Sequence, residues 1–153
     1  MSSLELKIPP PVIALVLAVA MWGVSENTFA WPVPNVVRLS LALALVAIGV
    51  AFSTAGIIEF RRAQTTVNPR KPEAASTLVS SGVFKITRNP MYVGLVLFLV
   101  AWAVVLSSLW ALFGPLVFAL YIRRFQITPE ERVLSSIFGA EYVAYKERVR
   151  RLL

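Results

Sequence analysis

The chain has no cysteine, no histidine and no aspartate among its 153 residues. Without cysteine it can form neither a disulfide nor a thiolate nucleophile, and its redox compartment stays undetermined. Without histidine it lacks the usual general base near neutral pH and the common zinc ligand. No metal site is expected, so any catalysis must rest on glutamate, tyrosine, arginine, lysine, asparagine, backbone groups or a bound cofactor.

Charged residues are also scarce, at 15% of the chain, whereas apolar residues make up 58%. The mean hydropathy is +0.73. A soluble protein of this size has too small an interior to bury so much apolar surface. The composition therefore predicts an integral membrane protein, and the helix-length apolar runs described next make the expected fold all-α.

Three apolar runs are long enough to consider as membrane segments. Residues 8–24 and 36–58 each have close to the ~17–25 residues that a helix needs to cross the hydrocarbon layer. The third run, residues 92–122, is long for one helix and short for two. Hydropathy therefore leaves the number of segments open.

The distribution of lysine and arginine decides between one helix and two. Thirteen of the fifteen lie in residues 61–88 and 123–151, whereas residues 26–35 have none. The positive-inside rule places both rich stretches in the cytoplasm. We therefore predict that residues 92–122 form a short helical hairpin that turns at Ser107-Ser108. The result is about four transmembrane segments with cytoplasmic termini, and the four tryptophans near the outer interface.

A signal peptide is an alternative interpretation of the N-terminus, because Ala18-Val19-Ala20 resembles a cleavage site. The segment from Met1 to Lys7 has no net side-chain charge, however, and cleavage would leave the topology of the rest unchanged. In the second run, Gly49, Ser53 and Gly56 recur at helical spacing, which predicts close packing against another helix.

The C-terminal region has the pattern of an amphipathic helix. Thr128 is predicted as its N-cap, Pro129 as its first residue, and Glu131 as the partner in a capping box. Apolar residues then recur at helical spacing as far as Val149. We expect this helix to lie on the membrane or to cover the cytoplasmic loop of residues 61–89.

Each polar motif also has a purely structural explanation. Asn89 and Pro90 could be the N-cap and first residue of the third helix, with Lys85 and Arg88 reaching lipid phosphates. Glu130 could serve only the helix dipole. Tyrosines 142 and 145 would be interfacial anchors, and the arginines at 148, 150 and 151 would contact anionic lipid.

Taken together, the polar segments of residues 59–150 resemble the isoprenylcysteine carboxyl methyltransferase and phospholipid methyltransferase family. These are integral membrane enzymes that use S-adenosylmethionine. The resemblance is carried, in chain order, by residues 65–69, 78–84, 88–94, the pair Glu130-Glu131, and residues 138–145. It implies two N-terminal transmembrane helices in residues 1–60 and a methyltransferase core in residues 61–153. A prokaryotic inner membrane is the expected location.

The resemblance also implies a set of site residues, with Glu130 taking the ammonium group of the cofactor. Arg88, Tyr92 and Glu131 are the expected catalytic residues. S-adenosylhomocysteine would be the product. The expected cofactor-binding residues are Thr77, Leu78, Val79, Phe84, Asn89, Pro90, Met91, Tyr92 and Glu130.

Three departures from the eukaryotic prenylcysteine enzymes bear on the substrate. Asn89 replaces a histidine that follows arginine, Ser76 lies near another family histidine, and Gln126 stands where those enzymes have a substrate-binding arginine. Arg123 or Arg124 could substitute for that arginine. We therefore expect a lipophilic small molecule or a lipid head group, with a carboxyl, amine or thiol acceptor, rather than a prenylcysteine.

Two other functions are compatible with the sequence. One is a membrane reductase of the sterol type with a nicotinamide cofactor, and another is a catalytically inactive membrane scaffold of the same fold. A nucleic-acid partner is not expected despite a pI of about 10.4, because the basic residues lie at predicted membrane edges. The expected partners are membrane lipids and a lipophilic substrate.

Overall fold

The computed structural model describes residues 5–64 and 76–152. Every regular element in these two ranges is a helix, and the backbone pairing of β type is a single bridge between Thr87 and Arg150. The predicted all-α fold is confirmed for the described part of the chain. The predicted motif at residues 65–69 lies outside it.

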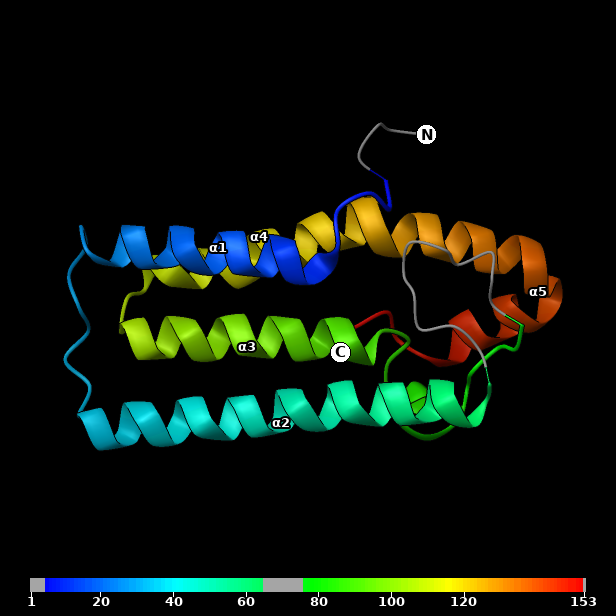
Figure 1. The fold of residues 1–153 in the computed structure, drawn as a ribbon, viewed down its shortest axis with the longest axis horizontal. Coiled ribbons are helices and arrows are strands. Elements are labelled where there is room, and N and C mark those ends of the chain that lie inside the picture. The colour runs from blue at the N-terminus through cyan, green and yellow to red at the C-terminus, as the bar shows by residue number, and fades with distance from the viewer. Residues whose placement is uncertain (1–4, 65–75, 153) are drawn as a thin grey trace.

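Four helices run up and down along one axis: α1 (Pro10–Ser25), α2 (Asn35–Arg62), α3 (Pro90–Leu106) and α4 (Phe113–Ile122). Prolines mark three of the starts: α1 and α3 begin with a proline, which removes no intrahelical hydrogen bond there, and Pro34 directly precedes α2. The alternating directions bring the last turn of α2, with Arg61 and Arg62, and the residues that follow α4 to the same end of the bundle (Figure 1). That end is called the basic end below.

The predicted hairpin in residues 92–122 is confirmed. Helix α3 stops at Ser107, whose φ of 53° lies in the left-handed region, and the short 3₁₀ helix η3 (Trp110–Leu112) leads into α4. The loop between α1 and α2 closes over this turn, since the backbone N–H of Trp31 donates to the Ser107 carbonyl at 2.7 Å. The Ser107 hydroxyl donates in return to the Trp31 carbonyl at 2.7 Å.

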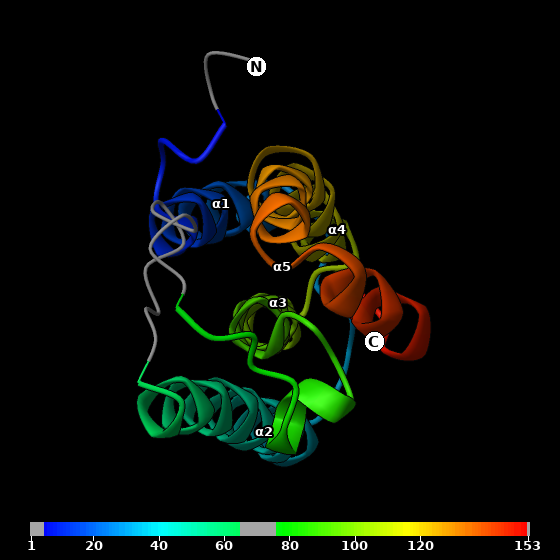
Figure 2. The same ribbon diagram turned by 90° about the vertical axis from the view of Figure 1, so that its right-hand side faces the viewer.

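Helix α3 lies among the other three (Figure 2), and glycines bring its backbone close to α2. A Cβ on Gly94 would lie 2.8 Å from the carbonyl oxygen of Gly49, and one on Gly56 would lie 2.9 Å from the ring of Pro90. Ser53 contacts Gly94 between them. The small-residue stripe therefore packs as predicted, with backbone against backbone.

The opposite side of α3 forms an apolar core with α1 and α4. Phe118 and Ile122 are fully buried there beside Leu99, and Met21 of α1 packs against Gly114. By length and composition, α2 can cross a membrane, whereas α1 and α3 are shorter apolar helices. The four predicted spans stay a prediction.

The prediction that Thr128 caps the start of a separate helix is wrong. A π-helical turn, η4 (Arg123–Ile127), joins α4 directly to α5 (Thr128–Arg148), and Thr128 donates its hydroxyl to the Arg123 carbonyl at 2.7 Å instead of capping. A wider turn suits the proline that follows, because Pro129 has no N–H for the Phe125 carbonyl. That carbonyl accepts from the backbone of Leu6 at 3.0 Å.

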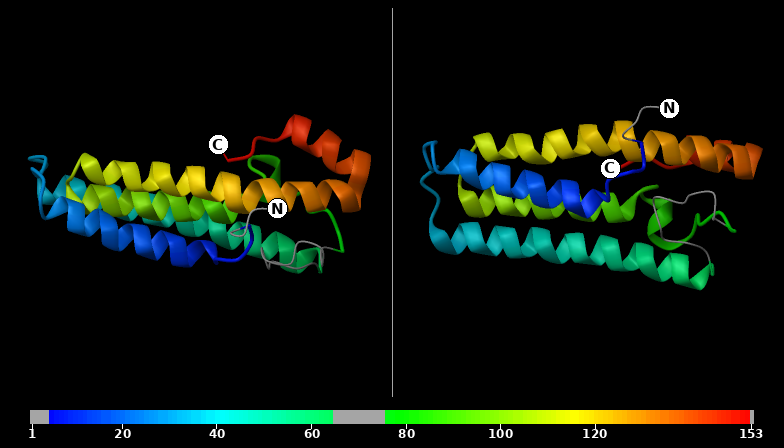
Figure 3. Two further views of the ribbon diagram at one scale, coloured as in Figure 1. Left: turned by 90° about the horizontal axis from the view of Figure 1, so that it is seen from above. Right: turned by 45° about the horizontal axis from the view of Figure 1, so that its top comes forward.

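Helix α5 is also not the single amphipathic helix expected. It breaks at Gly139, whose φ of 52° and ψ of −126° are open to glycine and strained for other residues. The chain then folds back toward the bundle (Figure 3). The second half of α5 packs on residues 78–84, so the part of the prediction that has the tail covering the loop is confirmed.

The close contact of α2 and α3 gives a test of packing. Gly94→Ala should lower stability by about 1–3 kcal/mol, because its new methyl group meets backbone that cannot move aside. The matched control is Gly23→Ala in α1, where a Cβ meets nothing within 4 Å. Thermal unfolding in detergent should show a lower Tm for Gly94→Ala and an unchanged or higher Tm for Gly23→Ala.

Candidate functional site

The polar residues singled out in the sequence gather at the basic end, where the loop before α3 meets α5. The loop is fixed first by α2. Ser81 donates its hydroxyl to the Glu59 carboxylate, which also pairs with Arg62 at 3.1 Å. The ring of Phe84, in the short 3₁₀ helix η2 (Gly82–Lys85), packs edge to face on Phe60 with centroids 5.2 Å apart.

The second half of α5 holds the loop from the other side. Val79, Phe84, Tyr142 and Tyr145 form a buried cluster. The Tyr145 hydroxyl donates to the Phe84 carbonyl at 2.7 Å, and burial raises the pKa of Tyr145 to about 12. The interpretation of both tyrosines as interfacial anchors is therefore wrong, because the fold-back at Gly139 turns them inward.

Glu131 is the hub of the charged groups. Its carboxylate accepts two hydrogen bonds from the Arg151 guanidinium, at 3.0 and 2.5 Å, and lies 3.0 Å from Nη1 of Arg88. Only 11% of its side chain is exposed. Glu131 is therefore not a helix cap, and Arg88 and Arg151 bind a buried carboxylate rather than only lipid phosphates.

The residues after α5 form part of the same site. The backbone N–H of Arg88 donates to the Arg150 carbonyl at 3.0 Å, and Asn89 donates its side-chain amide to the Arg151 carbonyl at 2.7 Å. Asn89 occupies the N-cap position of α3, as the structural explanation expected, yet its side chain makes no cap hydrogen bond. It ties the C-terminal segment to the start of α3.

Glu130 and Tyr92 form a second, separate pair. The Tyr92 hydroxyl donates to Oε1 of Glu130 at 2.5 Å. Burial raises the pKa of Glu130 to about 8, with the hydrogen bond from Tyr92 lowering it and the charge of Glu131 raising it. A cation bound next to this carboxyl would stabilise its ionised form and lower its pKa.

Arg88 retains hydrogen-bonding capacity that the described residues do not use. Its Nε and Nη1 are buried and donate to no acceptor there, and Nη1 meets Glu131 as an ion pair without hydrogen-bond alignment. Buried donors of this kind normally have an acceptor. The site thus has a partly buried carboxyl that no described cation pairs with and, beside it, an arginine that pairs with Glu131 yet keeps an unused Nε donor.

The remaining predicted residues lie around these two pairs. Pro90 is buried against Gly56, Met91 is half-buried, Leu78 packs on the buried Val79, and Thr77 is exposed. The fold thus brings the catalytic predictions Arg88, Tyr92 and Glu131 together with Glu130. No described contact tests which of these residues binds a ligand.

Gln126, which stands where the prenylcysteine enzymes have a substrate-binding arginine, is not at the surface. It is fully buried in η4, and its amide donates to the Ile8 carbonyl at 2.8 Å while Oε1 has no partner among the described residues. Arg123 and Arg124 are exposed, and Arg124 lies 3.5 Å from the Glu5 carboxylate.

Sequence reasoning missed Arg151 as a site residue. Arg151 and Glu131 are twenty positions apart, and they meet only because α5 reverses at Gly139. A glycine inside a helical pattern is a known signal of such a break. It indicates where the chain turns but not which side chains meet afterwards.

Comparisons with known proteins show which family the chain belongs to. A family model described as phospholipid methyltransferase matches residues 37–141. Protein-S-isoprenylcysteine O-methyltransferases B and A of Arabidopsis thaliana are 30% and 29% identical over 113 residues, or 72% of this chain.

The matched region spans 56% of each plant protein, a little over half of its length. An uncharacterized protein of Haemophilus influenzae is 48% identical over 63 residues, which is its whole length and 41% of this chain. The family match covers more than half of the chain and includes the start of α3 and the glutamate pair. The chain therefore belongs to the phospholipid methyltransferase family.

Proposed function

We propose that this protein is a membrane methyltransferase that uses S-adenosylmethionine and acts at the cytoplasmic interface. The observation that carries the proposal is that one end of an apolar bundle has both the partly buried Glu130 carboxyl, whose pKa is raised, and the unused Nε donor of Arg88. The methionine portion of the cofactor has both an ammonium and a carboxylate. These two charges complement Glu130 and Arg88 respectively.

The other predicted residues would complete the pocket. Glu130 would hold the ammonium group, with Tyr92 orienting its carboxylate through the 2.5 Å hydrogen bond. Arg88 would donate from Nε to the cofactor carboxylate, held in place by Glu131. Apolar residues from Leu78 and Val79 to Pro90 and Met91 would face the less polar parts, as expected for a small-molecule site.

The cofactor supplies an electrophilic methyl group on a sulfonium. The protein's part is then to align the acceptor with it, exclude water and neutralise charge. A carboxyl or thiol acceptor is anionic or easily made so and needs no protein base, whereas an amine acceptor must lose a proton. Glu130, once bound to the ammonium of the cofactor, would not take that proton, because the bound cation lowers its pKa. Glu131 is engaged by two arginines, so we assign it to positioning Arg88 rather than to proton transfer.

Membrane placement supports a lipophilic acceptor. The outward faces of α1 and α2 carry many exposed aliphatic side chains, such as Leu15 at 66% and Leu43 at 69%. We propose that the four helices cross the membrane with the basic end in the cytoplasm, as the positive-inside rule requires. A lipid head group or lipophilic small molecule would then reach the site laterally between helices.

Calorimetric titration of the detergent-purified protein tests the cofactor directly. S-adenosylmethionine and S-adenosylhomocysteine should bind in the micromolar range, and NADPH should not. Glu130→Gln should weaken binding by on the order of tenfold to 100-fold, because a hydrogen bond to a charged group contributes about 1.5–3 kcal/mol.

The matched control is Glu141→Gln, an exposed carboxylate on the same helix, which should bind like the wild type. If the protein binds NADPH and neither sulfur nucleotide, the membrane reductase replaces this proposal. If it binds S-adenosylmethionine but transfers no methyl group to any lipid acceptor, the catalytically inactive scaffold is favoured. An equal loss in both variants would disprove the role of Glu130.

The pH dependence of S-adenosylhomocysteine binding gives an independent test. Because the pKa of Glu130 is raised to about 8, the carboxyl is mostly protonated at pH 6 and binding a cation requires its ionisation. Affinity should therefore rise from pH 6 to pH 8, by on the order of tenfold or more. In Glu130→Gln this rise should be absent, so that the two proteins converge at pH 6.

Arg151 gives a test of the charged hub. Arg151→Gln removes two hydrogen bonds to Glu131 and should cost about 1–3 kcal/mol, a Tm decrease of roughly 3–10 °C. The control is the adjacent Arg150→Gln, whose side chain is exposed while its backbone carbonyl contacts Arg88. Differential scanning fluorimetry should separate the two, and equal Tm values would exclude the hub as a stabilising element.

A further inference from the structure

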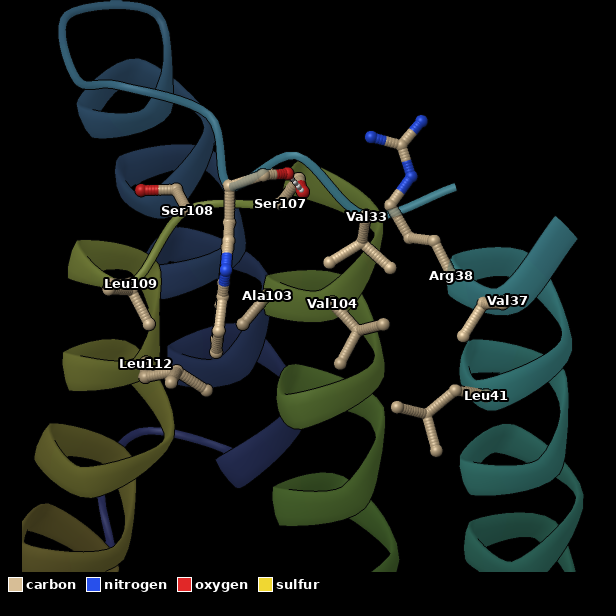
Figure 4. A pocket seen from close by; sticks show the side chains of 11 residues that line it. Val33, Val37, Arg38, Leu41, Ala103, Val104, Ser107, Ser108, Leu109 and Leu112 are labelled. Carbon is tan, nitrogen blue, oxygen red and sulfur yellow. Dashed lines mark hydrogen bonds between the residues drawn. The ribbon is translucent and has the colours of Figure 1, made fainter. Parts of the chain in front are cut away.

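An apolar groove lies at the end of the bundle away from the candidate site (Figure 4). Helix α2 forms one wall with Val37 and Leu41, α3 forms the floor with Ala103 and Val104, and Leu112 belongs to the opposite wall. The groove encloses about 140 Å³. Its lining is almost entirely hydrocarbon, so it suits an aliphatic chain rather than a polar ligand.

The groove opens on the outside of the bundle. The side chains that line its walls are about half exposed, with Val37 at 55%, Leu41 at 50% and Leu112 at 45%. Its upper edge is held in shape by the paired hydrogen bonds between Trp31 and Ser107. A chain can therefore enter from the side, from the lipid that surrounds a membrane protein.

Arg38 lies at the mouth of this groove. Its Nη2 donates to Asn35 at 3.0 Å, but its buried Nε has no partner among the described residues, and no described carboxylate pairs with it. It is also one turn inside the start of α2, where the helix dipole disfavours a cation. An anion from outside the protein would relieve both conditions.

The charge distribution makes this arginine distinctive. Between Ile8 and Phe60 it is the one lysine or arginine in the sequence, and residues 89–122 contain none. The positive-inside rule therefore does not explain it, because it lies at the end opposite to the basic stretches. A positive group above an apolar groove matches a phosphate above an acyl chain.

We propose that this groove binds an anionic phospholipid of the outer leaflet, with one acyl chain between α2 and η3 and the phosphate on Arg38. The inference depends on the membrane placement proposed above and not on methyl transfer. A zwitterionic lipid would bind less well, because its own cation competes with the guanidinium for the phosphate. The ligand is a structural lipid at a place remote from the reacting groups.

Native mass spectrometry of the full chain in detergent tests the proposal. Phosphatidylglycerol and phosphatidylcholine with identical acyl chains are added at equal concentration. The wild type should retain phosphatidylglycerol preferentially, and Arg38→Gln should reduce that preference by about fivefold. Arg61→Gln, at the other end of the same helix, changes the net charge equally and should leave the preference intact.

A second variant tests the groove itself. Val104→Phe should fill the floor and weaken binding of both lipids, and Leu112→Phe takes its place if Val104→Phe does not purify as a single species. The proposal is overturned if the wild type shows no preference, if Arg61→Gln loses as much as Arg38→Gln, or if filling the groove changes nothing. Cofactor binding by Arg38→Gln should stay unchanged, which separates this inference from the proposed function.

Discussion

The buried carboxylate of Glu131 is the interaction on which the basic end of the molecule depends. It joins three parts of the chain, because Arg88 precedes α3, Glu131 lies in the first half of α5, and Arg151 follows the second half. A buried carboxylate is unfavourable without cationic partners, and the two arginines are equally unfavourable without it. The fold-back at Gly139 and the docking of the C-terminal segment on Asn89 are therefore held by the same charges.

Glu130 and Glu131 are adjacent but have different partners. Glu131 is engaged by arginines, whereas its neighbour Glu130 contacts Tyr92 and keeps a raised pKa. Adjacent residues on a helix point in different directions, so one carboxylate can face the charged hub while the other faces the start of α3. This arrangement gives the pair a physical meaning: one member fixes Arg88, and the other remains available to a cation.

The two ends of the bundle differ in kind. The basic end gathers nearly all of the titratable groups that could bind a polar cofactor, whereas the opposite end has an apolar groove, the turn at Ser107 and a single arginine. Between them, glycines allow α2 and α3 to approach until backbone meets backbone. The chain spans only 56% of the length of the plant proteins that it matches, and this small bundle brings its polar segments together with few other elements.

The sequence by itself determined the helical class, the hairpin, the family and the grouping of Arg88, Tyr92, Glu130 and Glu131 at one end. These follow from hydropathy, from the one-sided placement of lysine and arginine, and from local motifs, all of which act over short distances along the chain. Only the tertiary structure decided that η4 and α5 are continuous with α4, that Tyr142 and Tyr145 are buried, and that Arg151 binds Glu131. Those contacts depend on the backbone reversal at Gly139 and on a π-helical turn before Pro129. The pattern of residues along the sequence indicates where the chain can bend, but it does not indicate which distant side chains then come into contact.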